Sequence, residues 1–360
     1  MSMGQGRAGS SWRRWAGVPY EVAARFRAWL YRRGWPTRTR LPRPVVSVGN
    51  LTVGGTGKTP VVIHLVEQLT GQGKRVAVLS RGYRRRSSAA QLLVSDGRRL
   101  LASAEEAGDE PYLIASRCPG AIVAVGADRV ALGTWVLQQA PVDCFVLDDG
   151  FQHLRLHRDV DLLLVDASDP EGIQAALPFG RLREPITAAR RADAILITRA
   201  GSAVEAEPVW RCLTQACGPL PAPVLVQFRA DSFQRIGGNE TKTADALKDA
   251  PALLFSGVGN SGSFHALAKA LGIVVRETLD FRDHAHYTAE IVERIRQRTK
   301  ACGAELAVTT EKDAGKVVPF LSPDDVWWAV RLQTEIVVGR ERLTQLLRLK
   351  LAVVMQEGRA

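Results

Sequence analysis

Residues 49–59, which read GNLTVGGTGKT, form a glycine-rich segment between a predicted strand and a predicted helix. The strand covers residues 45–49, and apolar residues recur with helical spacing over about residues 58–70. Glycines at 71 and 73 end the helix, and residues 75–80 (RVAVLS) predict a second strand. Because a strand–helix–strand unit joins parallel strands, this segment predicts an α/β fold.

The end of the segment, GGTGKT, matches the last part of a Walker A phosphate loop. Glycines let backbone N–H groups surround phosphate oxygens, Lys58 is suited to the β and γ phosphates of ATP, and the Thr59 hydroxyl is suited to Mg²⁺. A strict motif has glycine where this chain has Thr52, so the loop is a variant. The residues predicted to bind ATP are Gly54, Gly55, Thr56, Gly57, Lys58 and Thr59.

A second motif is an apolar run that ends in two carboxylates, residues 144–149 (CFVLDD). A phosphate loop works with an acidic residue at the end of a nearby strand, which orients Mg²⁺. Asp148 and Asp149 both fit this role, and the sequence does not choose between them. The metal site is therefore predicted to consist of Thr59 with one or both of these aspartates.

Short apolar runs continue along the chain, separated by helical or loop sequence. This rhythm predicts a P-loop NTPase-like, doubly wound, mostly parallel sheet with a second, smaller α/β domain. Residues 229–250 are polar and rich in turn residues, so the domain junction is expected there. The predicted divisions are an N-terminal segment 1–43, a P-loop domain 44–232 and a C-terminal domain 233–360.

The net charge of +11 is concentrated at the N-terminus: residues 1–43 hold ten Arg and one acidic residue, Glu21. Within them, Val18, Val22, Phe26, Trp29 and Leu30 form one stripe of a predicted amphipathic helix. Arg and Trp on such a helix favour a segment lying in an anionic membrane interface, although a helix packed on its own domain gives the same pattern. The remainder is almost neutral, which argues against nucleic-acid binding.

The five cysteines are odd in number and none forms a CxxC pair. This argues against a disulfide framework or a structural zinc site and favours a reducing cytosol. No run approaches 18 apolar residues, so no membrane-spanning helix is predicted.

Seven motifs, read together and in order, resemble one family. They are residues 48–60 (VGNLTVGGTGKTP), 80–83 (SRGY), 108–111 (GDEP), 148–153 (DDGFQH), 181–185 (RLREP), 281–284 (FRDH) and 310–313 (TEKD). The set is similar to the tetraacyldisaccharide 4′-kinases, the lipid A 4′-kinases of Gram-negative bacteria, from about residue 18 to about residue 335. The resemblance implies ATP-dependent phosphorylation of the 4′-hydroxyl of a tetraacyldisaccharide 1-phosphate, in a cleft between two α/β/α domains.

The resemblance also assigns roles to single residues. Asp109 matches the proposed general base and His284 its partner, while Arg81 matches an arginine placed near phosphates. The family often has a second histidine where this chain has Ala285, so only His284 is carried over. The implied cofactors are ATP and Mg²⁺. The implied setting is a peripheral or monotopic monomer on the cytoplasmic face of the bacterial inner membrane, binding lipid and no nucleic acid.

Other interpretations of these residues remain open from the sequence. Asp109 could cap a helix that begins near Pro111, and His284 could be a surface residue of a polar loop. Residues 310–313 could orient the nucleotide base or hold a domain interface. The chain could also be a membrane-recruited P-loop ATPase switch, which would hydrolyse ATP without phosphorylating lipid.

Overall fold

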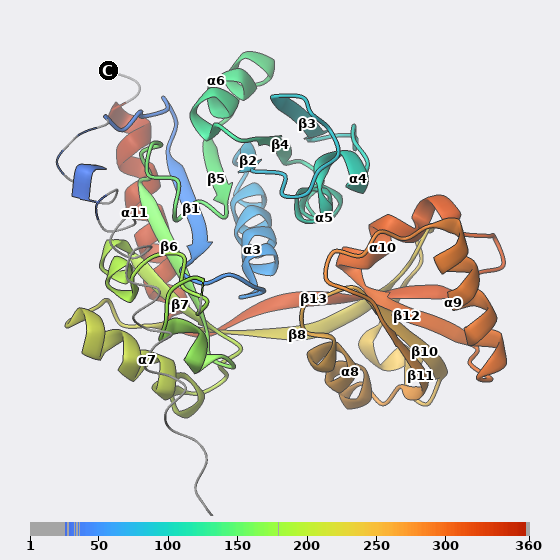
Figure 1. The fold of residues 1–360 in the computed structure, drawn as a ribbon. Coiled ribbons are helices and arrows are strands. Elements are labelled where there is room, and N and C mark those ends of the chain that lie inside the picture. Colours follow the sequence, from blue (N-terminus) through green and yellow to red (C-terminus); the bar gives the residue numbers. More distant parts are fainter. Residues whose placement is uncertain are drawn as a thin grey trace, which may run out of the picture. The chain divides into compact units, whose positions relative to one another are not determined.

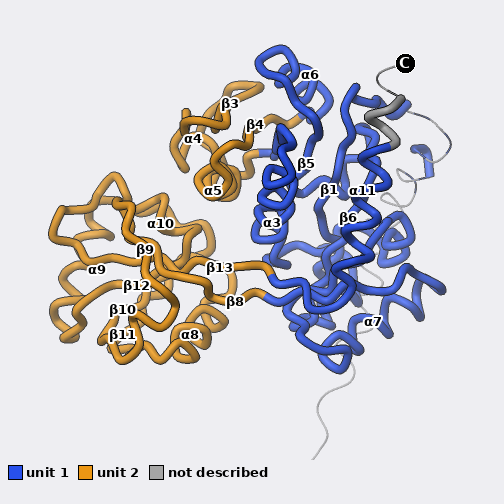
Figure 2. Tube along the Cα trace, turned by 180° about the vertical axis from the view of Figure 1, so that it is seen from behind, with its two compact units in different colours: residues 1–81, 128–227, 335–360 blue, residues 82–127, 228–334 orange. Residues whose placement is uncertain are grey.

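The computed structural model describes residues 26, 29–31, 33, 35, 37–178 and 180–357. The chain forms two compact units (Figure 2). Unit 1 comprises Met1–Arg81, Asp128–Gln227 and Glu335–Ala360, and unit 2 comprises Gly82–Ala127 and Phe228–Thr334. Two of the divisions fall inside long strands, β8 (Val224–Arg235) and β13 (Trp327–Val338). Unit 2 is thus built from two separate segments of the sequence.

Unit 1 contains a parallel sheet with the strand order β8-β7-β6-β1-β5-β2 (Figure 1). Its further strands are β1 (Val45–Asn50), β2 (Val76–Ser80), β5 (Cys144–Asp148), β6 (Val160–Asp166) and β7 (Ala194–Thr198). Every residue of β1 is buried, as expected for a central parallel strand that is covered on both faces. The predicted mostly parallel α/β sheet is confirmed.

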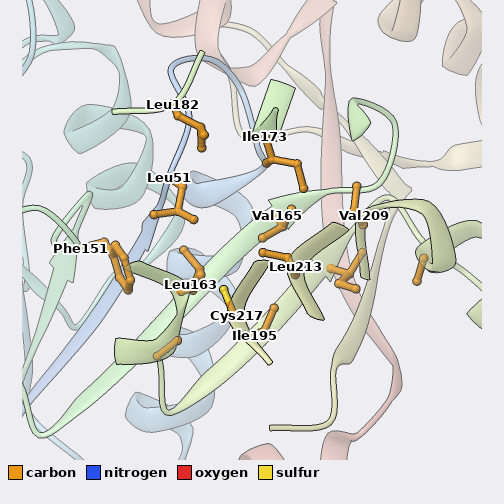
Figure 3. Packing of buried hydrophobic residues seen from close by; sticks show 14 of the residues in the cluster. Leu51, Phe151, Leu163, Val165, Ile173, Leu182, Ile195, Val209, Leu213 and Cys217 are labelled. Carbon is orange, nitrogen blue, oxygen red and sulfur yellow. The ribbon is translucent and has the colours of Figure 1, made fainter. Parts of the chain in front are cut away.

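Unit 1 includes the helices α3 (Lys58–Gly71), α6 (Arg129–Gln139), α7 (Ala203–Cys217) and α11 (Arg340–Glu357), with 3₁₀ turns η1 (Pro170–Ile173) and η2 (Ile186–Arg191). Helix α7 packs Val209 and Leu213 against Leu163 and Ile195 of β6 and β7 (Figure 3). The same cluster includes Leu51, at the start of the glycine-rich loop. Burying each such side chain contributes about 1.5–3 kcal/mol, so the loop is anchored in the hydrophobic core.

The first segment of unit 2 is a small α/β element. Strand β3 (Gln91–Asp96) pairs antiparallel with β4 (Ile122–Gly126), and between them lie α4 (Ala104–Ala107) and α5 (Asp109–Arg117). Strand β3 is not among the strands that the sequence predicts. Its first three residues are half-buried rather than buried, so its apolar pattern is weak.

The second segment of unit 2 holds the parallel strands β11-β10-β12-β13. Its elements are β9 (Thr241–Thr243), η3 (Ala244–Leu247), β10 (Pro251–Ser256), α8 (Ser261–Ala270), β11 (Val274–Asp280), α9 (Ala289–Ala301), β12 (Leu306–Thr310), α10 (Glu311–Val317) and η4 (Val318–Phe320). Alternate residues of β10 belong to two different apolar clusters: Leu254 packs in one with Trp328, and Phe255 packs in the other with Trp327. This alternation places apolar side chains on both faces of the sheet.

The described part of the predicted amphipathic helix includes Phe26 and Trp29, which are 58% and 43% exposed. Their rings stack with centroids 5.9 Å apart, and the guanidinium of Arg33 lies 5.1 Å from the centroid of the Trp29 ring. Val18 and Val22 of the predicted stripe lie outside the described residues. Among the described residues, no helix combines the length and the apolar character that crossing a bilayer requires.

Candidate active site

The glycine-rich loop connects β1 to α3 and uses two glycines in backbone conformations that other residues rarely adopt. Gly54 has φ +116°, and Gly57, the N-cap of α3, has φ +79°. Since Gly57 has no side chain, the first N–H groups of α3 are left for another acceptor. A helix N-terminus with such groups favours anions through both its donors and its dipole.

The departure from the strict Walker A motif has a structural explanation. Thr52 forms an antiparallel bridge with Leu182, and the N–H of Val53 donates to the carbonyl of Arg181 at 2.7 Å. The backbone at Thr52 is therefore paired with a second segment and has no need of glycine. Glycine is instead required at Gly54, where a Cβ would lie 2.0 Å from Nη2 of Arg181.

Lys58 and Asp149 lie together beside this loop. Nζ of Lys58 is 3.6 Å from Oδ1 of Asp149, and Nη1 of Arg183 donates to Oδ2 of Asp149 at 2.7 Å. Burial raises the pKa of Asp149, but the charges of Lys58 and Arg183 outweigh it and hold this pKa below its usual value. Asp149 is therefore a carboxylate at neutral pH.

Asp148 occupies a different environment, although it is the neighbouring residue. It is 1% exposed, and its Oδ2 accepts a hydrogen bond from Oγ of Ser80 at 2.8 Å. Strands β1 and β5 are adjacent and parallel, with Val48 in register with Asp148. Asp148 is the last residue of β5 and Asp149 follows it. Because the carboxyl ends of parallel strands meet at one edge of a sheet, both aspartates lie beside the loop that follows β1.

Asn50 is a residue of this site that the sequence analysis missed. Its Nδ2 donates to Oγ1 of Thr56 at 2.9 Å, and its Oδ1 accepts from Nζ of Lys58 at 3.4 Å. The hydroxyl of Thr198 donates to the carbonyl of Thr56 at 2.9 Å. The available signal was a polar residue at the end of a buried strand, since Asn50 is 0% exposed. These contacts hold the loop residues Thr56 and Lys58 against the ends of β1 and β7.

Two arginines also hold the loop, and neither was assigned a role from the sequence. Nε of Arg181 donates to the carbonyl of Val53 at 3.0 Å, and Nη2 of Arg199 donates to the carbonyl of Gly55 at 3.0 Å. Arg181 in addition forms an ion pair with Asp169 at 2.6 Å. Arg199 also forms an ion pair, with Asp166. Two guanidinium groups, each paired with an aspartate, thus hold the loop backbone in place.

The residues present fit a magnesium nucleotide. The N-terminus of α3 and Lys58 offer donors for phosphate oxygens, and a Cβ at Gly55 would meet no atom of the described residues within 4 Å. Thr59 and the two aspartates offer oxygen donors, which Mg²⁺ prefers. No cluster of three or more His, Cys, Asp or Glu residues able to hold a metal occurs in the described chain.

Arg81 directly follows β2 and is exposed. Arg129, nearby in space, is only 5% exposed. Burial and the positive charge of Arg81 lower the pKa of Arg129, while the negative charges of Asp148 and Asp149 raise it. Because β2 pairs in parallel with β5, Arg81 follows its strand at the same edge of the sheet as the two aspartates.

The structure brings Asp109 and His284 together within unit 2. Nδ1 of His284 lies 3.1 Å from Oδ2 of Asp109, across 175 residues of sequence. His284 has φ +59°, and its ring meets the ring of Tyr83 edge to face at 5.8 Å. Asp109 does not cap a helix near Pro111, because α5 begins at Asp109 itself and its N-cap is Gly108.

A third charged residue, Lys316, was missed by the sequence analysis. Its Nζ lies 3.0 Å from Oδ2 of Asp109. Burial raises the pKa of Asp109. The hydrogen bond from His284 and the charge of Lys316 lower this pKa by more, so it lies below its usual value. Asp109 is therefore ionised at neutral pH and able to accept a proton.

Comparison with known proteins identifies the family of this chain. The model of a family described as tetraacyldisaccharide-1-P 4′-kinase matches residues 14–352. The tetraacyldisaccharide 4′-kinase of Geobacter metallireducens is 41% identical over 319 residues, covering 89% of this chain and 92% of the relative. The enzyme of the same name from an Anaeromyxobacter species is 38% identical over 337 residues, covering 92% and 89%.

Among solved structures, the chain is similar to LpxK from Aquifex aeolicus, described as an "apo" form in complex with ATP. The TM-score is 0.75 and the identity 35%, with 93% of this chain and 97% of that chain covered. The fold, the variant phosphate loop and the ordered motifs all agree with a family match that spans residues 14–352. The chain therefore belongs to the tetraacyldisaccharide-1-P 4′-kinase family.

Proposed function

We propose that this chain transfers the γ-phosphoryl group of ATP to the 4′-hydroxyl of a tetraacyldisaccharide 1-phosphate, forming the bis-phosphorylated lipid A precursor. The observation that supports this most strongly is the family match across nearly the whole chain, on a protein whose variant phosphate loop leads into the N-terminus of α3. The alternative of an ATPase switch explains the loop but gives no role to the contact between Asp109 and His284.

In this proposal, unit 1 holds the nucleotide. Lys58 and the N–H groups of the loop and of α3 bind phosphate oxygens, and Asn50 keeps the Lys58 side chain in place. Thr59, Asp148 and Asp149 would hold Mg²⁺, with Asp149 the one beside Lys58 and Asp148 the one beside Ser80. When bound, the ion would neutralise phosphate charge. Arg81 adds positive charge at the same edge.

Unit 2 supplies the proton acceptor. As the 4′-oxygen forms its bond to the γ-phosphorus, its proton passes to the carboxylate of Asp109. The bond between the γ-phosphorus and the bridging oxygen breaks, and ADP leaves with the electron pair. A positioned base of this kind contributes about 10²–10⁴-fold to a rate. His284 orients the carboxylate through its Nδ1 contact and stabilises the charge.

A direct assay tests the proposal. Purified protein, Mg-ATP labelled in the γ-phosphate and tetraacyldisaccharide 1-phosphate in mixed micelles are incubated, and the lipid is separated and counted. We expect label in the lipid, at a rate that depends on the acceptor. Hydrolysis of ATP with no labelled lipid would contradict the kinase proposal and favour the ATPase switch.

We also propose that the N-terminal segment 1–43 binds an anionic membrane, on the cytoplasmic face of the bacterial inner membrane, where a peripheral enzyme meets its lipid substrate. Phe26 and Trp29 are exposed, and Arg33 lies against the Trp29 ring. Aromatic rings insert among acyl chains while arginine side chains reach phosphates, and each basic residue near an anionic leaflet contributes about 1 kcal/mol.

Removal of residues 1–34 should therefore weaken binding to anionic liposomes and reduce activity on lipid presented in bilayers. Binding of the full chain should also fall as salt is added, because part of it is electrostatic. Sedimentation with vesicles containing phosphatidylglycerol measures both effects.

A double variant, Phe26→Ser with Trp29→Ser, serves as a matched test, since both side chains are exposed and their loss should not lower the melting temperature. Equal sedimentation of the full chain, the truncated chain and the double variant would refute the proposal that the N-terminal segment 1–43 binds the membrane.

A further inference from the structure

Helix α10 and its N-cap, Thr310, pack against α5, the helix that begins with Asp109. Three ion pairs connect α10 to α5: Glu311 with Arg117 at 2.7 Å, Lys312 with Glu110 at 3.1 Å, and Lys316 with Asp109 at 3.0 Å. All of these residues belong to unit 2. The motif TEKD, whose role the sequence left open, is thus part of a contact that positions α5.

Asp313 is the central residue of this contact. It is 0% exposed, yet it is fully satisfied: Oδ2 accepts from the N–H of Gly257 at 2.9 Å and from Oγ1 of Thr310 at 2.8 Å. Its Oδ1 lies 3.1 Å from Nζ of Lys316. A buried carboxylate is costly unless it is paired and hydrogen-bonded, so Asp313 fixes the position of Lys316.

Asp313 is also linked to His284, the contact partner of Asp109, through backbone hydrogen bonds. The carbonyl of Gly257 accepts from the N–H of His284 at 3.1 Å, so one glycine links Asp313 to the histidine loop. A Cβ at Gly257 would lie 3.0 Å from Cβ of Ala285 and 3.2 Å from Oδ1 of Asp313. The close packing leaves this loop little freedom to move relative to Asp313.

We propose that Lys316, held by Asp313, is a positioning residue for the Asp109–His284 pair: its ammonium fixes the carboxylate, while Asp313 and Gly257 fix the histidine loop. This inference rests on the proposed function only in its kinetic consequence, since the contacts themselves exist in the free protein. Lys316 acts through Asp109 and is not itself a catalytic residue.

The other charged groups around Asp109 show how much the Lys316 charge contributes to the pKa of this carboxylate. From α10 it faces Lys316 and Lys312, from the loop after β11 it faces His284, and Tyr287 and Asp313 lie nearby. Lys312 is itself paired with Glu110. Lys316 is therefore the lysine in direct contact with the carboxylate, and its removal should raise the pKa of Asp109. An opposite charge in contact typically shifts a carboxyl pKa by about 1–3.

The test uses the full chain with Lys316→Met, which keeps the length of the side chain and removes its charge. We expect kcat at neutral pH to fall about 10²-fold, the cost of a misplaced reacting group, with KM for ATP little changed. The acidic limb of the kcat profile should move to higher pH by about one pH unit or more. Lys316→Arg, which restores a cation, should return the limb toward its wild-type position.

The matched control is Arg298→Met. It removes a cation that pairs with Glu277 between α9 and β11, elsewhere in unit 2, and should leave kcat and the acidic limb unchanged. Wild-type kcat with an unmoved limb in Lys316→Met would overturn the inference. So would a loss of activity that disappears once the rate is expressed per folded molecule from melting curves.

A measurement that needs no activity separates this inference from the proposed function. Carboxyl ¹³C signals of aspartate-labelled protein are titrated, with the Asp109 signal assigned by its loss in Asp109→Asn. Its midpoint should move to higher pH in Lys316→Met, and an unmoved midpoint overturns the inference. A wild-type protein that phosphorylates no lipid refutes the proposed function, while this titration still decides the role of Lys316.

Discussion

We expect Lys58→Ala to abolish phosphoryl transfer and to leave the protein folded. The lysine lies at the start of α3, 3.6 Å from Asp149 and 3.4 Å from Asn50, so in the proposed mechanism its charge is aimed at the γ-phosphate. Phosphoryl transfer depends on positioning and electrostatic stabilisation, and losing one preorganised donor costs about 10²–10³-fold or more. Initial rates of lipid labelling at saturating ATP measure the effect.

Lys350→Ala is the control for this substitution. Lys350 belongs to α11 of the same unit and pairs with Asp193 at 3.5 Å, so its loss should leave the rate unchanged. Melting curves establish that both variants are folded. A folded Lys58→Ala protein with near wild-type turnover would show that the loop does not bind the transferred phosphate.

Asp109→Ala and His284→Ala should each lower kcat by about 10²–10⁴-fold, the usual contribution of a positioned base. Affinity for ATP should change little, because in the proposal Lys58 and the loop bind the phosphates and these two side chains do not. Since the two side chains are in contact at 3.1 Å, the double variant should lose much less than the product of the single effects. Single-turnover rates with saturating ATP give all three values.

Two further variants isolate the imidazole. His284 has a left-handed backbone, so alanine there adds strain, whereas His284→Asn suits that conformation and should lose as much activity. His286→Ala, at an exposed position in the same loop, should be nearly neutral. Fully multiplicative losses would refute a shared role, as would an Asp109→Ala protein that melts early but has normal turnover per folded molecule.

The fold was predictable where a local pattern decides it. Residues 45–80 have an apolar strand, a glycine loop and an apolar helix in sequence, and the structure follows with β1, α3 and β2. Strand β3 was not predicted, because its half-buried edge gives little periodicity. The extension of β8 to Arg235, through sequence that resembles a polar linker, depends on pairing with β9 and lies beyond local pattern.

The site divides in the same way. Lys58, Thr59, Asp148 and Asp149 could be proposed from the sequence because chemistry and spacing coincide within short motifs. Asn50 and Arg183 contact them through folding of the loop, which no spacing rule describes. Asp109 and His284 were paired only by resemblance, and Lys316 was missed altogether because its contact requires α10 and α5 to pack against each other.

The assembly of unit 2 from two segments has a consequence for biosynthesis. Asp109 leaves the ribosome 175 residues before His284, and synthesis at about 5–20 residues per second puts roughly 10–35 s between them. During that interval the nascent chain has the charged start of α5 but neither of its partners, which lie beyond residue 280. A chain released early, even one with all of β1, α3 and the phosphate loop, therefore lacks the contacts that position Asp109. Translation through Lys316 is therefore the step that supplies the last of these contacts to Asp109.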